Sequence, residues 1–497
     1  MLNKVKENIE KFNTKESFVI NETSYTYGEF AQNISNVRNL LESLSPTKNE
    51  IIGVVTYNDI ETYSTIYALW FCGLCFLPIN PLLPVSRNEA VMKQASIRFI
   101  LSSKESTEVI SENSNIQLYS TGNISKKPIN LSLPTLSDSD LMYILFTSGS
   151  TGVPKGVPIN RRNLNGFIDG FYANGYSLDE NDKFLQMFDF TFDISVQCYV
   201  LPLCIGASIH TIPLDDIKFF TIYQILDKHK ITIAKMVPSV IAFLRPYFPK
   251  IKLPNLKYSL FSGEALYNEV VAEWSKCVPN AIIQNYYGPT EATIDCLYFT
   301  WNELTQTEKT YNGIISIGKT FGDSKAVILA EDGSIITDTE KGELCISGSQ
   351  VTTGYLNLPE KNKSAFITLK YDGSDCTFYR TGDLVFRDKD GDYMYCGRID
   401  HQVQVQGYRV ELGELEHHAK TIAGNIQVAA IAKDKSPGNT QLYLFLENSS
   451  LEISKIAEHL QQVLPYYMQP AKIIMLETFP LTPSGKINRN QLIELIE

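Results

Sequence analysis

The sequence has few histidines and an odd number of cysteines, and each shortage excludes a class of protein. Only six His occur in 497 residues, and the adjacent His417 and His418 would point in different directions on a helix, so no zinc site is expected. The nine Cys are spread over a long chain, unlike the disulfide framework of a small secreted domain. No Ser-His-Asp or Cys-His arrangement for nucleophilic catalysis stands out.

The sequence also lacks an apolar run long enough to cross a membrane. The longest, residues 66–79, is broken by Gly73 and Pro78 and falls short of the ~20 residues that a bilayer requires. Cys72 and Cys75 lie inside this run, and we interpret them as buried thiols instead of a redox pair. The polar N-terminus has no apolar signal core or small-residue cleavage site. A reducing, cytoplasmic location is therefore expected.

Acidic residues outnumber basic ones. Asp and Glu number 55 and Lys and Arg number 44, which gives a formal net charge of −11. This negative net charge repels phosphate backbones and anionic lipids, so neither nucleic acid nor a membrane is expected as a partner. With 44% hydrophobic and 20% charged residues the chain is globular, and its length predicts about three structural units.

The pattern of apolar residues changes along the chain. Up to about residue 300, β-rich runs such as 51–57, 97–103 and 231–237 alternate with helical patterns, which is typical of mostly parallel sheets covered by helices. From residue 313 to 395, short strands are separated by turns of the Asp-Gly type. This second stretch predicts a more antiparallel unit.

After Asp400 the sequence predicts a separate C-terminal lobe of about 95 residues. A helix is expected at 412–420, strands at 426–432 and 441–446, and a second helix at 453–463. We find no internal repeat and no low-complexity segment.

The richest segment for chemistry is LMYILFTSGSTGVPKG, residues 141–156. An apolar strand over 141–146 runs into a loop of glycines, hydroxyl side chains and a lysine. Glycine lets backbone N–H groups approach an oxyanion, while the hydroxyls and the lysine add donors and charge. The Walker spacing is absent, which disfavours a P-loop ATPase, and a surface turn is the alternative for such a loop alone. The loop residues are Thr147, Ser148, Gly149, Ser150, Thr151, Gly152, Lys155 and Gly156.

This loop resembles the signature loop of the adenylate-forming enzymes, which include amino-acid adenylation domains, acyl-CoA synthetases and luciferases. The sequence most resembles the amino-acid-activating branch of nonribosomal peptide synthetases and D-alanyl carrier-protein ligases. Further motifs match in order across nearly the whole chain: YTYGEF (25–30), FDIS (192–195), NYYGPTE (285–291), GELCISGSQVTTGYL (342–356), YRTGDL (379–384), GRIDHQVQVQGYRVELGELE (397–416), LPYYMQP (464–470) and SGKINR (484–489).

The resemblance implies an α/β fold in two parts. Residues 1–399 are expected to form a large N-terminal core of packed mixed sheets with helices and a distorted antiparallel β subdomain. Residues 400–497 are expected to form a small, mobile α+β lobe that carries the catalytic lysine, with Asp400 as the hinge. Gly407 and Tyr408 would line the route of a phosphopantetheine arm once the lobe has rotated.

Several motifs carry nucleotide-binding residues. In NYYGPTE a ring that can stack on adenine lies four residues before a carboxylate that can hold Mg²⁺. The resemblance assigns these roles to Tyr287 and Glu291, and it places Asn285 at the adenine edge and Thr290 at the α-phosphate. It also assigns ATP binding to Gly263 and Glu264 and to Thr147, Ser148, Gly149, Ser150, Thr151 and Lys155 of the loop.

Two further charged residues are implied at the nucleotide. Asp383 of YRTGDL can accept both ribose hydroxyls, and Arg398 of GRID is placed nearby. A structural salt bridge is the alternative for either. Lys486 of SGKINR is the lysine that the small lobe would deliver, because an ammonium can shield the charge that develops between a carboxylate and a phosphate. The attacking carboxylate is already ionised, so no general base is required.

The substrate is predicted from the segment FDIS. Asp193 lies where amino-acid adenylation domains keep an aspartate for the α-ammonium group. Lys235 is a charge among apolar residues and needs a partner if buried. If Asp295 neutralises it, the substrate is neutral and polar, with serine as the first guess; if it is free, an acidic or amide side chain fits better. D-Alanine remains an alternative substrate. The other predicted pocket residues are Ile194, Gln197, Leu260, Ser262, Tyr286 and Ile294.

The resulting hypothesis is an ATP- and Mg²⁺-dependent ligase that forms an aminoacyl-AMP, releases pyrophosphate and transfers the aminoacyl group to a phosphopantetheine thiol. No carrier signature follows Lys486, so the thiol is expected on a separate carrier protein, unless the chain is a piece of a larger synthetase. The alternatives are an acyl- or aryl-CoA synthetase, which Asp193 disfavours, and a non-catalytic nucleotide-binding protein.

Overall fold

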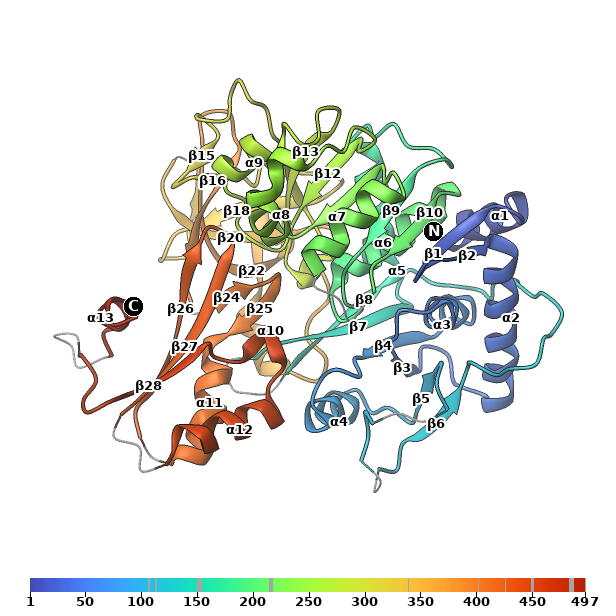
Figure 1. Ribbon diagram of the computed structural model, residues 1–497, viewed down its shortest axis with the longest axis horizontal. Coiled ribbons are helices and arrows are strands. Elements are labelled where there is room, and N and C mark those ends of the chain that lie inside the picture. The colour runs from blue at the N-terminus through green and yellow to red at the C-terminus, as the bar shows by residue number, and fades with distance from the viewer. Residues whose placement is uncertain are drawn as a thin grey trace.

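The computed structural model describes residues 1–105, 108–111, 114–149, 154–213, 218–337, 339–400, 402–424, 426–447, 451–481 and 487–496. A large N-terminal lobe and a small C-terminal lobe lie side by side, with the small lobe in orange and red (Figure 1). In these ranges, no helix is both long and apolar enough to span a bilayer.

The first sheet of the large lobe has the strand order β17-β14-β13-β12-β11-β9-β10-β1-β2. Its inner strands are parallel, and only β2, β14 and β17 at the edges pair in antiparallel fashion. The strands are β1 (Glu16–Ile20), β2 (Thr23–Thr26), β9 (Lys183–Gln186), β10 (Ser208–Thr211), β11 (Ile233–Met236), β12 (Tyr258–Phe261), β13 (Ile282–Tyr287), β14 (Leu297–Thr300) and β17 (Lys319–Thr320).

The second sheet has the order β6-β5-β3-β4-β7-β8 and is parallel except for the hairpin of β7 and β8. The alternation of strands and helices therefore predicted the parallel sheets correctly, and the strands expected at 51–57, 97–103 and 231–237 are present as β3, β5 and β11. The second sheet contains β3 (Ile51–Val55), β4 (Cys75–Ile79), β5 (Phe99–Ser102), β6 (Gln117–Ser120), β7 (Leu141–Thr147) and β8 (Lys155–Asn160).

Helices cover both sheets and fill the space between them (Figure 1). The helices are α1 (Leu2–Lys11), α2 (Tyr27–Leu44), α3 (Ile60–Phe71), α4 (Val85–Gln94), α5 (Arg161–Ala173), α6 (Asp193–Ile205), α7 (Lys218–Lys228), α8 (Pro238–Leu244), η1 (Arg245–Lys250), α9 (Asn268–Trp274), η2 (Thr290–Ala292) and α10 (Pro359–Ala365).

Helices α3 and α6 join the two sheets into one core. Both are apolar on nearly every face, as expected of helices that are buried all round. Tyr199 of α6 packs its ring against Tyr63 and Trp70 of α3, with ring centroids 5.7 and 6.1 Å apart. The apolar run 66–79 thus forms the end of α3 and strand β4. Cys75 is buried as predicted, Cys72 is half-buried against the core, and both are free thiols.

The third sheet is antiparallel, as the Asp-Gly turns predicted. Gly333, Gly373 and Gly391 of these turns have φ between 78° and 83°, a conformation that favours glycine. This part of the chain contains β15 (Thr310–Tyr311), β16 (Ile314–Ile315), β18 (Lys325–Leu329), β19 (Ile335–Ile336), β20 (Gly342–Ser347), β21 (Phe366–Tyr371), β22 (Ser374–Arg387) and β23 (Tyr393–Arg398).

The small lobe has a hydrophobic core of its own, and its predicted strands and helices are all present. The hairpin β24–β25 extends from it toward β22 of the large lobe, whereas α13 lies at the opposite side (Figure 1). The elements are β24 (Gln402–Val405), β25 (Tyr408–Glu411), α11 (Leu412–Ala423), β26 (Val428–Ser436), β27 (Asn439–Glu447), α12 (Ile453–Val463), η3 (Tyr466–Met468), β28 (Lys472–Leu476) and α13 (Arg489–Glu494).

Candidate active site

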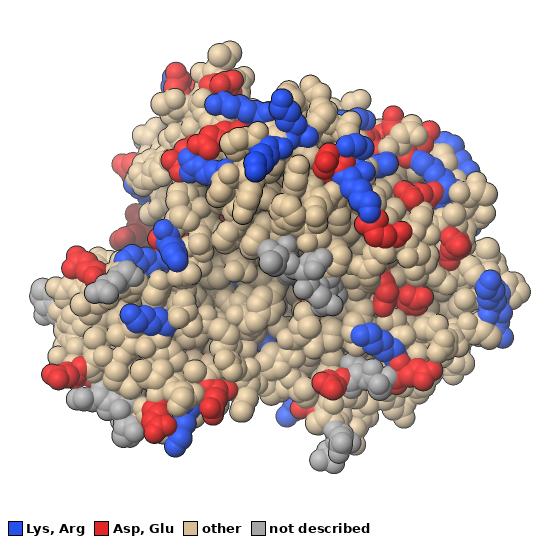
Figure 2. Space-filling view, in the orientation of Figure 1, with Lys and Arg blue, Asp and Glu red and all other residues tan. Residues whose placement is uncertain are grey.

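A cavity of about 700 Å³ lies between the two lobes. Ser148, Gly263 and Tyr287 reach it from the carboxyl ends of β7, β12 and β13, where α/β proteins bind their ligands. On the outer face shown in Figure 2, by contrast, acidic and basic side chains are interspersed among uncharged ones. The predicted residues that line the cavity are Thr147, Ser148, Asp193, Ile194, Gly263, Glu264, Asn285, Tyr286, Tyr287, Thr290, Asp383, Arg398, Asp400, Gly407 and Tyr408.

Asp383 and Arg398 form an ion pair in one wall of this cavity. Arg398 Nη1 donates to Asp383 Oδ1 at 2.7 Å, and its Nε and Nη2 donate to the two oxygens of Asp400 at 2.6 and 2.8 Å. Tyr287 donates its hydroxyl to the other oxygen of Asp383. Burial raises the pKa of Asp383, and Arg398 acts in the opposite direction. The structure thus brings four residues from three predicted motifs into one cluster.

The turn after Tyr287 allows a close approach between two backbone segments. A Cβ atom at Gly288 would lie 2.4 Å from the carbonyl oxygen of Ile294. The segment that approaches it is itself unusual, because Thr293 and Ile294 have φ of 56° and 74°, in the left-handed region. Asn285 lines the same wall, and its side-chain amide donates to the backbone carbonyls of Ile315 and Ser316 at 3.3 and 3.0 Å.

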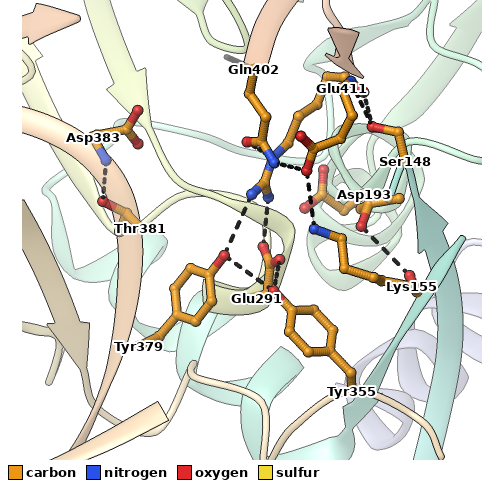
Figure 3. Close-up of polar contacts among 12 residues, drawn as sticks. Ser148, Lys155, Asp193, Glu291, Tyr355, Tyr379, Thr381, Asp383, Gln402 and Glu411 are labelled. Atoms are coloured by element: carbon orange, nitrogen blue, oxygen red, sulfur yellow. Dashed lines mark hydrogen bonds and ion pairs between the residues drawn. The ribbon is translucent and has the colours of Figure 1, made fainter. Parts of the chain in front are cut away.

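Glu291 is fully buried beneath the hairpin β24–β25. Its carboxylate accepts a hydrogen bond from the Tyr355 hydroxyl at 2.6 Å (Figure 3). It accepts another from Arg409 Nη1 at 2.9 Å. Burial alone would raise the pKa of Glu291, but the positive charges of Arg409 and Lys155 outweigh it and lower the pKa to about 2. An ionised carboxylate suits Mg²⁺, which is bound through one or two carboxylates, keeps several waters and binds substrate phosphates. No group of three or more His, Cys, Asp and Glu in the described ranges is arranged to hold a metal.

The glycine-rich loop is described only in part. Ser150 and Thr151 lie outside the described residues, and the buried Gly149 is the last residue before that gap. The Ser148 hydroxyl donates to the carbonyl oxygen of Arg409 at 2.8 Å and accepts the backbone N–H of Glu411 at 3.2 Å.

Lys155 stands at the start of β8, opposite Thr147 at the end of β7. Its ammonium lies 3.3 Å from the carboxylate of Glu411 (Figure 3). Burial, together with the nearby charge of Arg409, lowers the pKa of Lys155. The hairpin therefore contacts both the loop and this lysine.

Glu264 joins the two lobes on the other side of the cavity. Its carboxylate accepts the backbone N–H groups of Ser239 at 2.8 Å and of Gly407 at 2.7 Å. Burial raises the pKa of Glu264 to about 7. The preceding Gly263 has a φ of 89°, which lets the chain turn at the end of β12.

Asp193 begins helix α6 and lines the cavity at its large-lobe side. Its carboxylate accepts the backbone N–H of Ile294 at 3.3 Å. Burial, with a contribution from the nearby Asp295, raises the pKa of Asp193 to about 7. A cation placed here would compensate a carboxylate that is costly to ionise alone.

Lys235 and Asp295 settle an alternative that the sequence left open. Lys235 Nζ lies 2.7 Å from Asp295 Oδ2, and Ser262 donates its hydroxyl to Asp295 Oδ1 at 2.6 Å. The ammonium also lies 4.0 Å from the ring centroid of Tyr286. Lys235 is therefore paired. The predicted pocket residues behind the cavity wall, all buried, are Gln197, Lys235, Leu260, Ser262, Ile294 and Asp295.

Three residues of the hairpin at this site were missed by sequence reasoning. Gln402 is bonded to both Arg409 and Glu411. These two residues pair with Glu291 and Lys155 of the large lobe, although all three hairpin residues fall within a motif that the sequence had singled out. In β25 the charged residues alternate with Tyr408 and Val410. That alternation is usual for a strand with one solvent-facing side, so only the docking of the hairpin shows that the charges are covered.

Lys486, the predicted catalytic lysine, lies outside the described residues. Helix α13 follows it and packs on β26, where Lys433 Nζ donates to the carbonyl oxygen of Ile496 at 2.5 Å. The role of Lys486 therefore stays a prediction.

Comparison with known proteins identifies relatives of this chain. The model of the AMP-binding enzyme family matches residues 5–356. Zwittermicin A synthase ZmaJ of Bacillus cereus is 29% identical, with 95% of this chain and 91% of that protein covered. The D-alanine–D-alanyl carrier protein ligase of Lactiplantibacillus plantarum is 30% identical, with 95% and 94% covered. Other relatives are long synthase subunits, of which the chain spans 9–18%.

A solved structure shows the same fold. The holo form of PA1221, a nonribosomal peptide synthetase protein with adenylation and carrier domains, matches with a TM-score of 0.88 at 22% identity, covering 100% of this chain and 84% of that one. The architecture of a large lobe with two sheets, an antiparallel subdomain and a small lobe is therefore that of the adenylate-forming fold. The chain belongs to the family of AMP-binding enzymes and is an AMP-forming, adenylating ligase.

Proposed function

We propose that this protein activates a small, neutral amino acid with ATP and Mg²⁺ as an aminoacyl-AMP, and then transfers the aminoacyl group to the phosphopantetheine thiol of a separate carrier protein. The D-alanyl carrier protein ligase that it resembles over nearly its full length supports both half-reactions. The carboxylate of Asp193 at the cavity wall is the observation that carries the choice of an amino acid.

The nucleotide roles follow from the clustering of the predicted residues. Tyr287 and Asn285 are proposed to hold adenine, and Asp383, supported by Arg398, to hold the ribose hydroxyls. Thr290 and the loop from Thr147 to Lys155 would contact the phosphates. Mg²⁺, when bound, would neutralise phosphate charge beside Glu291, whose low pKa keeps it ionised.

Asp193 separates the proposed function from its nearest rival. An α-ammonium group beside Asp193 would pair with a buried carboxylate that forms no ion pair within the described residues. An acyl- or aryl-CoA synthetase has no use for that charge, because its substrate carries none at this position. The substrate is therefore proposed to be an amino acid.

The side chain of the substrate is proposed to be small and neutral. The ion pair of Lys235 and Asp295 cancels the charge at the base of the pocket, so an acidic or basic substrate side chain would find no partner there. Both residues are buried and neither is among the residues that line the cavity, whereas Ile194, Gly263 and Tyr286 line it. Serine stays the first guess, and alanine of either hand is the alternative.

The two lobes are proposed to divide at residues 399 and 400, with Asp400 as the hinge. The hairpin places Gly407 and Tyr408 in the cavity wall, where the phosphopantetheine arm would enter. We therefore assign the observed arrangement to thioester formation. Delivery of Lys486 to the nucleotide would belong to the other arrangement.

The test is amino-acid-dependent exchange of pyrophosphate into ATP. We expect exchange with serine or with L- or D-alanine, and little with aspartate, lysine, acetate or benzoate. Asp193→Asn, which keeps the shape but removes the charge, should lose exchange with amino acids, while the exposed variant Glu458→Gln should not. Exchange supported by simple carboxylic acids would instead favour the acyl- or aryl-CoA synthetase. A cytoplasmic location remains a prediction.

A further inference from the structure

The hairpin β24–β25 contacts three of the large-lobe groups that the proposed function assigns to the phosphates and the metal. Ser148 exchanges hydrogen bonds with the backbone of Arg409 and Glu411. Lys155 is paired with the carboxylate of Glu411 at 3.3 Å, and Glu291 with the guanidinium of Arg409 at 2.9 Å. Each of these three groups, Ser148, Lys155 and Glu291, thus already has a partner from the small lobe.

The signs of these charges match those of a metal–pyrophosphate complex. Glu291, assigned to a divalent cation, is paired with the guanidinium of Arg409. Lys155, assigned to a phosphate oxygen, is paired with the carboxylate of Glu411 (Figure 3). The Ser148 hydroxyl, assigned to the same phosphates, donates its proton to the carbonyl oxygen of Arg409 and accepts the backbone N–H of Glu411. One β-strand therefore presents a cation and an anion two residues apart, in the arrangement that the large lobe recognises.

The hairpin is built to hold these two charges in place. Gln402 accepts a hydrogen bond from Arg409 Nε at 2.8 Å and donates its amide to Glu411, so it links both side chains across the hairpin. The backbone N–H of Gly407 at the turn is anchored on Glu264. The side chains of Lys155 and Glu411 are only 8% and 10% exposed, and that of Glu291 is 0% exposed, so loss of either partner would leave a buried charge alone.

We propose that Arg409 and Glu411 act as an internal substitute for magnesium pyrophosphate, which competes with the hairpin for Glu291, Lys155 and Ser148. The hairpin docks when the metal–pyrophosphate complex leaves, and added magnesium pyrophosphate displaces the hairpin. Departure of the first product is thereby coupled to the arrangement that accepts the carrier thiol. This inference depends on the ligand roles in the proposed function but not on the identity of the amino acid.

Binding of magnesium pyrophosphate to the full-length protein, measured by titration calorimetry without amino acid, tests the competition. Glu411→Gln and Arg409→Gln each remove one charge from the hairpin and so weaken an ion pair that stabilises its docking. Because a weakly docked hairpin competes less with the ligand, each variant should bind magnesium pyrophosphate at least about tenfold more tightly. The matched controls Glu458→Gln and Lys420→Gln remove the same charges from exposed positions on α12 and α11 and should bind as the wild type does.

Unchanged or weaker binding of magnesium pyrophosphate by Glu411→Gln would overturn the inference. It would mean that the hairpin has no effect on the binding of this ligand or contributes to it. If Arg409→Gln does not fold, Glu411→Gln carries the test alone, since it keeps the size and shape of the side chain.

Hydrogen exchange of the segment 402–411 gives an independent readout of hairpin docking. In the wild type, saturating magnesium pyrophosphate should speed exchange at the amides of Gly407 and Glu411, which are bonded to Glu264 and Ser148. Magnesium alone, or pyrophosphate with a chelator, should have a much smaller effect, because each replaces only one of the two charges. Slow exchange that persists at saturation, or equal release by metal-free pyrophosphate, would contradict the proposal. Both readouts omit the amino acid, so a failed amino-acid panel would count against the proposed function alone.

Discussion

The pair of Lys235 and Asp295 permits a sharp test of how the pocket sets its charge. The two side chains are 2% and 0% exposed, their charged atoms are 2.7 Å apart, and Ser262 donates a further hydrogen bond to Asp295. Removing one partner of such a pair leaves an uncompensated buried charge, which costs about 3–5 kcal/mol. We therefore expect Asp295→Asn and Lys235→Met each to lower the free energy of unfolding of the large lobe by about that amount.

Urea unfolding followed by tryptophan fluorescence measures this cost directly, because Trp70, Trp274 and Trp301 are the three tryptophans of the chain and all lie in the large lobe. The double variant with both substitutions should lose clearly less stability than the sum of the two single losses, since it leaves no charge unpaired. Additive losses, or single losses below about 1 kcal/mol, would refute the assignment of a coupled buried pair.

The same variants test the link between charge and substrate. Asp295→Asn leaves the ammonium of Lys235 unpaired, so the ratio of pyrophosphate exchange with aspartate to that with its neutral isostere asparagine should rise at least about tenfold. Lys235→Met leaves the opposite charge and should not raise this ratio. An unchanged ratio in Asp295→Asn, in protein that is still folded at the assay temperature, would contradict the argument that this pair makes the pocket neutral.

Four further outcomes are expected. Lys486→Ala should slow exchange by ~10²–10³ through loss of one preorganised donor, and a variant with wild-type exchange would refute its assignment. Burial raises the pKa of Asp193 to about 7, so the KM for the amino acid should fall as the pH rises toward 7 and then level off. Because this carboxyl holds its proton more tightly in the folded than in the unfolded protein, its contribution to the free energy of unfolding is lost as the pH rises through about 7. Asp383→Ala should raise the KM for ATP with little change in that for the amino acid, which nucleotide titrations at fixed amino acid would show. Gly288→Ala should lower the thermal midpoint measurably, because its Cβ would lie 2.4 Å from the carbonyl oxygen of Ile294.

Much of the fold could be predicted because its signals are local. The alternation of strands and helices predicted parallel sheets. The Asp-Gly turns predicted antiparallel hairpins, and the glycines of these turns do have positive φ. The cluster of Tyr287, Asp383 and Arg398 was predicted only through ordered motifs, since nothing local brings together residues that are 96 and 15 positions apart.

The sequence by itself indicated which groups the site contains: a glycine-rich loop, a carboxylate after an aromatic turn, and the aspartate of the segment FDIS. The tertiary structure decided which charges are paired. Lys235 and Asp295 are 60 residues apart, and Arg409 is 118 residues from Glu291. A charged side chain in a sequence has no fixed partner, and only the fold decides whether water or an opposite charge surrounds it.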